Sequence, residues 1–298
     1  MLQKIKQLII KRSNHSLNKN GELTTEEAEI ILQRTFDENN NKTSEITFAG
    51  EEPEQEAFYV YKNNLCVEEK INHCIDGFSE NATIIYNSDN LISQQIKKYE
   101  YGNEITNFYY QGKNLIKKEV CDDDGTIENL TKIDYLNDMV VLLEEYSPLD
   151  RLVLKRDVTI ENEVIIEEKQ WSIENNKTLT IKYNRWQKEV EPSYSILNAD
   201  GKVLERTTRI YNDDKQLVEE IVETTSQGYQ KYITKLEYDA HGNMICSETK
   251  NSNDEIIKKI ETLYNNTLPI KTTHIEVNKL IDNSIQHYTD FFEYDFFE

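Results

Sequence analysis

Apolar and polar residues alternate with a period of two along most of this chain, and short polar turns interrupt the alternation at regular intervals. A tyrosine closes each alternating segment, and the residue two positions before it is apolar in six of eight cases. A period of two predicts β-strands with one face more buried than the other. The six apolar residues are Tyr59, Ile84, Phe108, Ile133, Ile181 and Leu236.

The tyrosines recur at a nearly constant distance. The steps between successive tyrosines are almost equal from Tyr61 to Tyr135 and slightly longer from Tyr183 to Tyr264. The gap between Tyr135 and Tyr183 is twice as long, and Ile160 lies near the place of the missing tyrosine. A fixed period of this length predicts an array whose units stack on their neighbours. The repeat anchors are Tyr61, Tyr86, Tyr110, Tyr135, Tyr183, Tyr211, Tyr238 and Tyr264.

Each tyrosine precedes a turn rich in Asn, Asp, Gly and Lys, and a second polar turn, such as DDDG at 122–125, lies between tyrosines. Such residues tolerate left-handed backbone and favour hairpin turns. Two strands and two turns per unit predict a mainly β fold. Over positions 51–298 we expect a long antiparallel meander, with a repeat of about 25 residues.

The first fifty residues follow another pattern. Leu2, Ile5, Leu8 and Ile9 have helical spacing, and a second run at 24–36 has its apolar residues spaced in the same way. The spacing predicts two short amphipathic helices, followed by a polar linker and a domain boundary near Gly50. The apolar residues of the second run are Ala28, Ile31, Leu32 and Phe36.

Between the two runs, SLNKNGELTTEE at 16–27 resembles an EF-hand calcium loop. The resemblance implies oxygen ligands around a glycine turn, closed by a bidentate glutamate. The matching ligand positions are Ser16, Asn18, Asn20 and Glu27. The alternative is a capping box of Thr24 and Glu27 that begins a helix.

The segment YDAHGNM at 238–244 is similar to the tyrosine-aspartate (YD) repeat of Rhs-type proteins from bacterial polymorphic-toxin systems. Related turns at Tyr61, Tyr86, Tyr110 and Tyr211 keep the tyrosine and lose the aspartate. The resemblance implies a curved sheet of the YD/Rhs kind. A short free-standing chain of this kind further resembles the small repeat proteins encoded beside toxin genes, which act as immunity proteins.

The net charge of the chain limits the classes of partner that we expect. Charged residues make up 30% of the chain and the net charge is −21, which disfavours nucleic acid and anionic membranes and favours a basic protein. The alternative is that the charge keeps an exposed sheet soluble. The N-terminal residues include neither a signal peptide nor an apolar span, so we expect a cytoplasmic protein.

Residue patterns for catalysis are absent. The sequence contains no HExxH motif, no phosphate-binding glycine loop and no recognisable triad order, and its acid runs fall in turns. The four cysteines have no metal-ligand spacing. We therefore expect a protein that is not an enzyme and has no cofactor. The histidines are His15, His73, His241, His274 and His287.

Two segments are candidates for partner binding. Trp171 and Trp186 flank the least regular part of the repeat, where an insertion often binds. The acidic tail TDFFEYDFFE carries a cluster of aromatic residues of the kind that anchors interfaces, although the alternative is a cap on the end of the array. These aromatic residues are Phe291, Phe292, Tyr294, Phe296 and Phe297.

The leading hypothesis is an antitoxin: a non-catalytic immunity protein that neutralises a basic bacterial toxin, encoded nearby, by direct binding. The alternatives are a scaffold or shell-like YD-repeat protein of a toxin-delivery system, and a calcium-responsive binding module. The identity of the toxin and the oligomeric state stay open.

Overall fold

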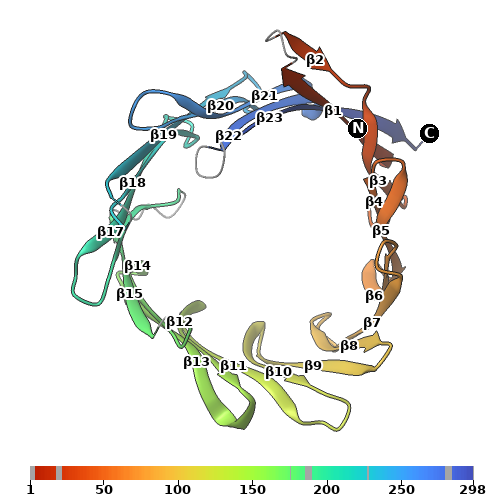
Figure 1. Ribbon diagram of the computed structural model, residues 1–298. Coiled ribbons are helices and arrows are strands. Elements are labelled where there is room, and N and C mark those ends of the chain that lie inside the picture. The colour runs from red at the N-terminus through yellow and green to blue at the C-terminus, as the bar shows by residue number, and fades with distance from the viewer. Residues whose placement is uncertain are drawn as a thin grey trace. The chain divides into compact units, whose positions relative to one another are not determined.

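The computed structural model describes residues 4–17, 22–174, 176–184, 190–226, 228–278 and 284–297. These residues form 23 β-strands and one short 3-10 helix (Figure 1). The contacts divide the chain into unit 1, Met1–Asn81 with Ile233–Glu298, and unit 2, Ala82–Tyr232. The mainly β fold that the alternation predicts is confirmed.

Unit 1 is an antiparallel sheet built from both ends of the chain. Hydrogen-bonded pairing runs in the order β19, β20, β21, β22, β23, β1, β3, β4, β5, β6, and β2 pairs with the end of β1. Its strands are β1 (Ile5–Leu17), β2 (Leu23–Thr25), β3 (Glu29–Phe36), β4 (Lys42–Ala49), β5 (Glu52–Lys62), β6 (Leu65–His73), β20 (Met244–Lys250), β21 (Ile256–Asn265), β22 (Leu268–Asn278) and β23 (Ser284–Phe296); β7 (Phe78–Tyr86) and β19 (Gln230–Tyr238) span the divisions between units.

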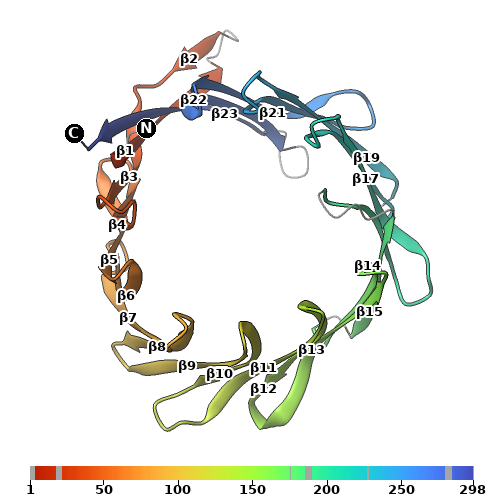
Figure 2. The same ribbon diagram turned by 180° about the vertical axis from the view of Figure 1, so that it is seen from behind.

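Unit 2 is an uninterrupted antiparallel meander, in which each strand from β8 to β17 pairs with the next along the chain (Figure 2). Its elements are β8 (Ile92–Tyr99), β9 (Gly102–Gln111), β10 (Asn114–Cys121), β11 (Ile127–Leu136), β12 (Met139–Ser147), η1 (Pro148–Asp150), β13 (Arg151–Glu161), β14 (Val164–Ser172), β15 (Lys177–Asn184), β16 (Ser193–Leu197), β17 (Val203–Tyr211) and β18 (Leu217–Thr224). The predicted meander is therefore confirmed.

A five-residue turn recurs between these strands. In the YDAHGNM segment, the Oδ1 atom of Asp239 accepts hydrogen bonds from the backbone N–H groups of His241 and Asn243, and Gly242 has a φ of 83°. The side chain of the first residue thus holds the turn, while the fourth adopts the left-handed backbone that glycine and asparagine tolerate. Two backbone hydrogen bonds also close this turn: the Asp239 N–H donates to the Asn243 carbonyl oxygen, and the Gly242 N–H donates to that of Asp239. The same pair of backbone hydrogen bonds occurs in the turns that begin at Asp37, Asn87, Asp122, Asn198, Asn212 and Asn251.

Other turns have two residues. Asn63 and Asn64 have φ angles of 54° and 62°, and Asn137 and Asp138 have 51° and 62°. Two successive positive φ angles are typical of the type I′ turn, whose twist matches that of the flanking strands. Gly50, where the sequence suggested a domain boundary, lies in the β4–β5 hairpin turn with a φ of 66°.

The repeated tyrosine has a shared geometry. The pairing register between two strands shifts by one residue next to many of these tyrosines, so one of the two strands has a β-bulge there. The tyrosines with such a shift are Tyr61, Tyr135, Tyr211, Tyr238 and Tyr264. Bulges redirect a side chain. The same shift occurs at Ile160, which occupies the missing anchor position of the sequence repeat.

The tyrosine hydroxyl then reaches back over the sheet. Tyr61 donates to the carbonyl oxygen of Lys42 at 3.0 Å, Tyr110 to that of Ile92 at 2.9 Å, and Tyr135 to that of Leu115 at 3.1 Å. Tyr211 makes the equivalent bond to Glu191 at 2.8 Å. Each of these tyrosines therefore ties its hairpin to the preceding one, which explains the repeat in physical terms.

The sheet does not enclose a conventional core. Among the described residues the buried apolar side chains are Ala57, Ala82 and Cys121. The accessible surface is 19649 Å² for a chain of 35.1 kDa, against about 13,000 Å² for a typical folded monomer of this mass. Exposed Phe58 and Val60 alternate with half-buried Tyr59 and Tyr61 along β5, so both faces of the sheet remain accessible.

The prediction of two N-terminal helices is wrong. Ile5–Leu17 is strand β1 and Glu29–Phe36 is strand β3, and the two pair with each other from Gln7 opposite Thr35 to Arg12 opposite Glu29. The apolar run LII at 8–10 also fits a strand, because isoleucine is β-branched. Pairing with β3 and β23 satisfies the backbone of β1 on both sides and outweighs the helical spacing.

Candidate functional site

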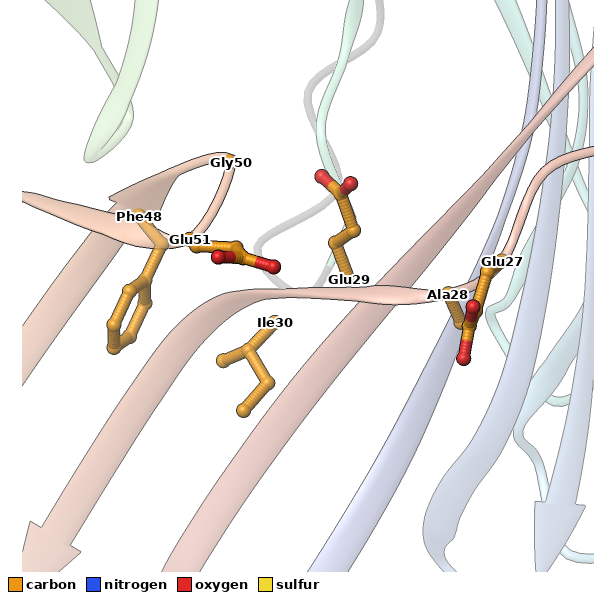
Figure 3. A pocket seen from close by; sticks show the side chains of 7 residues that line it. All are labelled: Glu27, Ala28, Glu29, Ile30, Phe48, Gly50 and Glu51. Carbon is orange, nitrogen blue, oxygen red and sulfur yellow. The ribbon is translucent and has the colours of Figure 1, made fainter.

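A pocket of about 410 Å³ lies in unit 1 at the start of β3 and the β4–β5 turn. We call it the glutamate pocket, because three of its lining residues are Glu27, Glu29 and Glu51. Figure 3 shows Glu29 and Ile30 projecting from opposite sides of the β3 ribbon, while Phe48 and Glu51 project from the neighbouring β4–β5 hairpin. The remaining lining residues are Ala28 and Gly50.

The local sequence explains how these residues come together. Strands β3 and β4 form a hairpin with Leu32 opposite Thr47, which places Ile30 and Phe48 near the same end of adjacent strands. Gly50 forms the left-handed turn that brings Glu51 next to them. The lining of the pocket therefore combines carboxylates with an aliphatic and an aromatic side chain.

The charge around the pocket has one sign. Unit 1 contains 15 basic and 27 acidic residues, a net charge of 15 − 27 = −12, and unit 2 contains 19 and 28, a net charge of −9. Among the described residues that line the glutamate pocket, none is a lysine or an arginine. A cationic group is the ligand that this arrangement favours electrostatically.

A second pocket, of about 750 Å³, lies in unit 2 where the repeat is least regular. Arg209 lies at its wall and pairs with Glu220 through Nε at 2.9 Å and with Glu191 through Nη1 at 2.9 Å. The Arg209 side chain is 17% exposed, whereas that of Glu191 is 77% exposed. Tyr183 and Tyr211 also line this pocket. Its charged groups thus pair with one another within the protein.

A partly buried charge network lies next to this pocket. Glu168, which is 6% exposed, accepts hydrogen bonds from Arg156 Nε at 2.6 Å and from the Tyr183 hydroxyl at 2.8 Å. Burial favours a higher pKa for Glu168, but the hydrogen bonds from Arg156 and Tyr183 outweigh it and lower the pKa. Burial and the hydrogen bond to Glu168 raise the pKa of Tyr183. The Tyr183 hydroxyl therefore joins an ionic cluster, whereas the Tyr110 hydroxyl donates to a backbone carbonyl oxygen.

Of the two tryptophans predicted for partner binding, Trp171 is a half-buried residue of β14, opposite Lys155 on β13 and Thr178 on β15. It is not among the described residues that line the unit 2 pocket. Trp186 lies outside the described residues.

The aromatic tail forms strand β23, which pairs with β22 on one side and β1 on the other. Phe292, Tyr294 and Phe296 share one face of this strand, and Phe291 lies on the other with 37% exposure. The Tyr294 hydroxyl donates to the carbonyl oxygen of Pro269 at 3.0 Å, and Phe297 follows the strand. The tail is thus a fully paired strand that joins the first and last parts of the chain.

The calcium-like loop lies between two strands. Ser16 of β1 is opposite Thr24 of β2, and their hydroxyls are 2.9 Å apart. Asn18 and Asn20 lie outside the described residues, and Glu27 lines the glutamate pocket. The helices that flank an EF-hand loop, and the helix that a Thr24–Glu27 capping box would begin, are replaced by β1, β2 and β3.

The titratable residues show two further features. The described part of the chain contains no cluster of three or more His, Cys, Asp or Glu side chains arranged to hold a metal ion, and its cysteines are free thiols.

The histidines that look scattered in the sequence are not all scattered in space. His15, His274 and His287 gather where β1, β22 and β23 meet.

Comparison with known proteins gives a likeness among solved structures only. No family model matches the chain, and no curated protein matches it. Among solved structures it is similar to a porin-like protein from Bacteroides uniformis ATCC 8492, with a TM-score of 0.33 and 11% identity over 98% of each chain. None of the helices in the described residues is long and apolar enough to cross a membrane.

This comparison corrects the hypothesis of a cytoplasmic immunity protein or antitoxin. The solved structure that aligns with nearly the whole chain is porin-like and is not an immunity protein. That hypothesis was wrong, and the scaffold and calcium-responsive alternatives stated with it are not carried further. At this TM-score the likeness carries no argument for a particular activity, so the proposal below rests on the residues of this chain.

Sequence reasoning missed most of the glutamate pocket. Glu27 stood out only as a calcium ligand, and Glu29 and Glu51 did not stand out at all. The acid-rich runs TTEEAE and AGEEPE were visible, but they lie more than twenty residues apart. The β3–β4 register was needed to bring them together.

Proposed function

We propose that this chain is a non-enzymatic binding protein whose ligand is a basic polypeptide, and that the glutamate pocket receives one of its lysine or arginine side chains. The observation that carries the proposal is the lining of the pocket, which combines Glu27, Glu29 and Glu51 with Ile30 and Phe48.

The chemistry of the pocket suits such a side chain. Lysine and arginine have an apolar stem and a charged head, so the stem contacts apolar groups while the head meets carboxylates. Ile30 offers an aliphatic surface, and the ring of Phe48 offers a face that attracts cations. The protein already uses this last contact internally, since Lys117 Nζ lies 3.9 Å from the ring centre of Tyr109.

The acidic excess supports the same ligand class at longer range. Both units carry a net negative charge, which accelerates the approach of a basic partner and falls off with added salt. The turn carboxylates stay ionised: hydrogen bonds from Asn41 lower the pKa of Asp37, and those from Asn243 lower the pKa of Asp239. These two carboxylates therefore keep their charge to a lower pH than an ordinary aspartate.

The relationship of this repeat to the YD/Rhs repeat is also part of the proposal. We regard the array as a degenerate form of the YD/Rhs repeat with a curved sheet. The support is the Asp239 turn, in which the aspartate of the YD pair accepts two backbone N–H groups, together with the turns of the same geometry at other hairpins.

The test measures binding of a fluorescent oligolysine peptide by anisotropy at low and at physiological salt. The first variant replaces Glu27, Glu29 and Glu51 with glutamine. The matched control replaces Asp124, Asp213 and Asp214 with asparagine. These three residues lie in exposed turns of unit 2, and their substitution removes the same number of negative charges as the pocket variant.

Loss of three partly exposed ion pairs, each contributing up to about 1 kcal/mol, predicts a Kd at least about tenfold higher for the pocket variant. The control removes the same charge from residues that do not line the pocket and changes the Kd by less than about threefold, because salt screens charges that do not contact the ligand. Equal weakening of binding by both variants would contradict the pocket, and absence of binding by the wild type at low salt would contradict the ligand class.

A further inference from the structure

The first and last strands of the chain meet along a seam. Strand β1 pairs with β23 from Ile5 opposite Phe296 to Asn14 opposite Tyr288, and the two lie side by side in Figures 1 and 2. Strand β22 flanks β23, and β3 flanks β1. The seam belongs entirely to unit 1.

One face of the seam carries an ionic and aromatic cluster. Arg12 pairs with Asp290 through two hydrogen bonds, Nε to Oδ1 at 2.8 Å and Nη2 to Oδ2 at 3.0 Å. The Arg12 guanidinium lies 4.0 Å from the ring centre of Tyr288. His274 stacks on the same tyrosine with ring centres 4.6 Å apart, and its Nε2 is 4.0 Å from Asp290 Oδ2.

The other face carries two more histidines in contact. The ring centres of His15 and His287 are 4.4 Å apart. His15 bridges two hydroxyls, with Nδ1 3.0 Å from Thr25 Oγ1 and Nε2 2.9 Å from Thr289 Oγ1. Thr289 is 3% exposed, so this contact lies within the sheet. Three of the five histidines in the chain thus touch this junction.

The surroundings of His274 and His287 favour the neutral imidazole. Burial lowers the pKa of His274; Asp290 and Glu276 oppose this effect, and Arg12 and Lys258 add to it. Burial and the neighbouring His15 lower the pKa of His287. The other charged groups on the strands around His15 and His287 largely form ion pairs. Lys11 pairs with Glu293, and Lys259 pairs with Glu261. Glu26 lies in the segment that follows β2.

We propose that the β1–β23 seam is acid-sensitive, and that protonation of His274 and His287 weakens the pairing of the first strand with the last. Protonation of His287 places a charge on a half-buried side chain whose ring centre is 4.4 Å from that of His15, next to Thr289, which is 3% exposed. His274 becomes a second cation beside Arg12. This inference is independent of the proposed ligand.

The direction of the effect follows from linkage. A histidine whose pKa is lower in the paired strand than in the released strand binds more protons when the seam opens. The contribution of the histidines is therefore complete above the ordinary pKa of about 6.5 and declines as the pH falls below it. Release of β1 and β23 exposes two strand edges that can pair with another chain.

The test is hydrogen exchange of the full-length protein at pH 7.5 and pH 5.5, corrected for the intrinsic pH dependence of exchange. This range lies above the ordinary pKa values of Asp and Glu side chains. Protection of the β1 and β23 amides falls by at least about tenfold at pH 5.5, because a released histidine with the ordinary pKa of about 6.5 is then protonated about ten times more often than it is neutral. Protection of β9 to β12 in unit 2 changes much less and serves as the internal reference.

Two variants complete the test. Combined His274→Gln and His287→Gln substitutions remove most of the pH dependence at the seam, whereas His241→Gln, in an exposed turn, leaves it unchanged. Equal loss of protection in β1, β23 and the β9–β12 reference at pH 5.5 overturns the proposal, as does pH dependence that survives the double substitution. If the double variant does not fold, the comparison of strands within the wild-type protein decides the matter.

Discussion

Removal of the Glu168 carboxylate provides a sensitive test of what stabilises a sheet without a conventional core. Glu168 is 6% exposed and receives hydrogen bonds from Arg156 and Tyr183. Hydrogen bonds to charged groups contribute about 1.5 to 3 kcal/mol each when buried. The Arg156 side chain is 37% exposed, so solvent compensates for part of the loss. We expect Glu168→Ala to lower the free energy of unfolding by about 2 kcal/mol.

The shift in melting temperature also reports the cooperative unit. An unfolding entropy of about 2.1 cal/mol/K per residue converts 2 kcal/mol into about 6 °C if unit 2, residues 82–232, unfolds alone. The same loss produces a shift of about 3 °C if all 298 residues unfold together. Differential scanning calorimetry measures both the shift and the number of transitions.

Matched variants separate the network from general effects of charge. Glu167 is adjacent on β14 and forms exposed ion pairs with Lys169 and Lys182 at 3.3 and 3.6 Å, so Glu167→Ala costs less than about 0.5 kcal/mol. Tyr183→Phe removes one hydrogen bond and costs about 1 kcal/mol. Equal destabilisation by Glu167→Ala and Glu168→Ala would show that the buried network contributes nothing beyond its charge.

The pH dependence follows from the same network. Because the pKa of Glu168 is lowered in the folded protein, its contribution is present above the ordinary glutamate pKa of about 4.3 and is lost as the pH falls further. The difference in stability between the wild type and Glu168→Ala should therefore shrink below about pH 4, and a constant difference down to pH 3 would contradict the assignment.

Two further predictions concern the repeat. Tyr110→Phe removes the hydrogen bond to the Ile92 carbonyl and lowers the free energy of unfolding in urea by about 1 kcal/mol, whereas Tyr101→Phe, at a residue 93% exposed, has almost no effect. Similar values for the two would show that the hydroxyl does not tie neighbouring hairpins. Asn198→Ala removes the acceptor of two turn N–H groups and costs about 1 kcal/mol, whereas Asp200→Ala in the same turn stays within about 0.5 kcal/mol; the reverse order would disprove the role of the first turn residue.

The regular part of the fold was predictable because its determinants are local. The alternation of residues, the Asn and Asp turns and the tyrosine period each act within one or two hairpins, so the antiparallel meander follows from them. The shifted register at Ile160 shows that the period holds even where the tyrosine is lost. The hydroxyl bonds of Tyr61, Tyr110 and Tyr135 reach only to the preceding hairpin.

The N-terminal segment was mispredicted because its determinant is distant. Ile5, Leu8 and Ile9 fit both a helix and a strand, and what decides between them is pairing with β23, at the opposite end of the chain. Long-range pairing leaves no mark in the spacing of a single segment. The same reason hid the glutamate pocket and the histidines of the seam, whose members come from separate strands.

The strands and turns of the repeat, the acidic charge and the tyrosine period could be inferred from the amino-acid order, since they depend on residues close together in the chain. The pairing of β1 with β23, the position of Glu51 beside Glu29 and the contact of His15 with His287 emerged only from the folded protein. These contacts depend on register, because a shift of one residue in strand pairing moves a side chain to the opposite face and changes its neighbours.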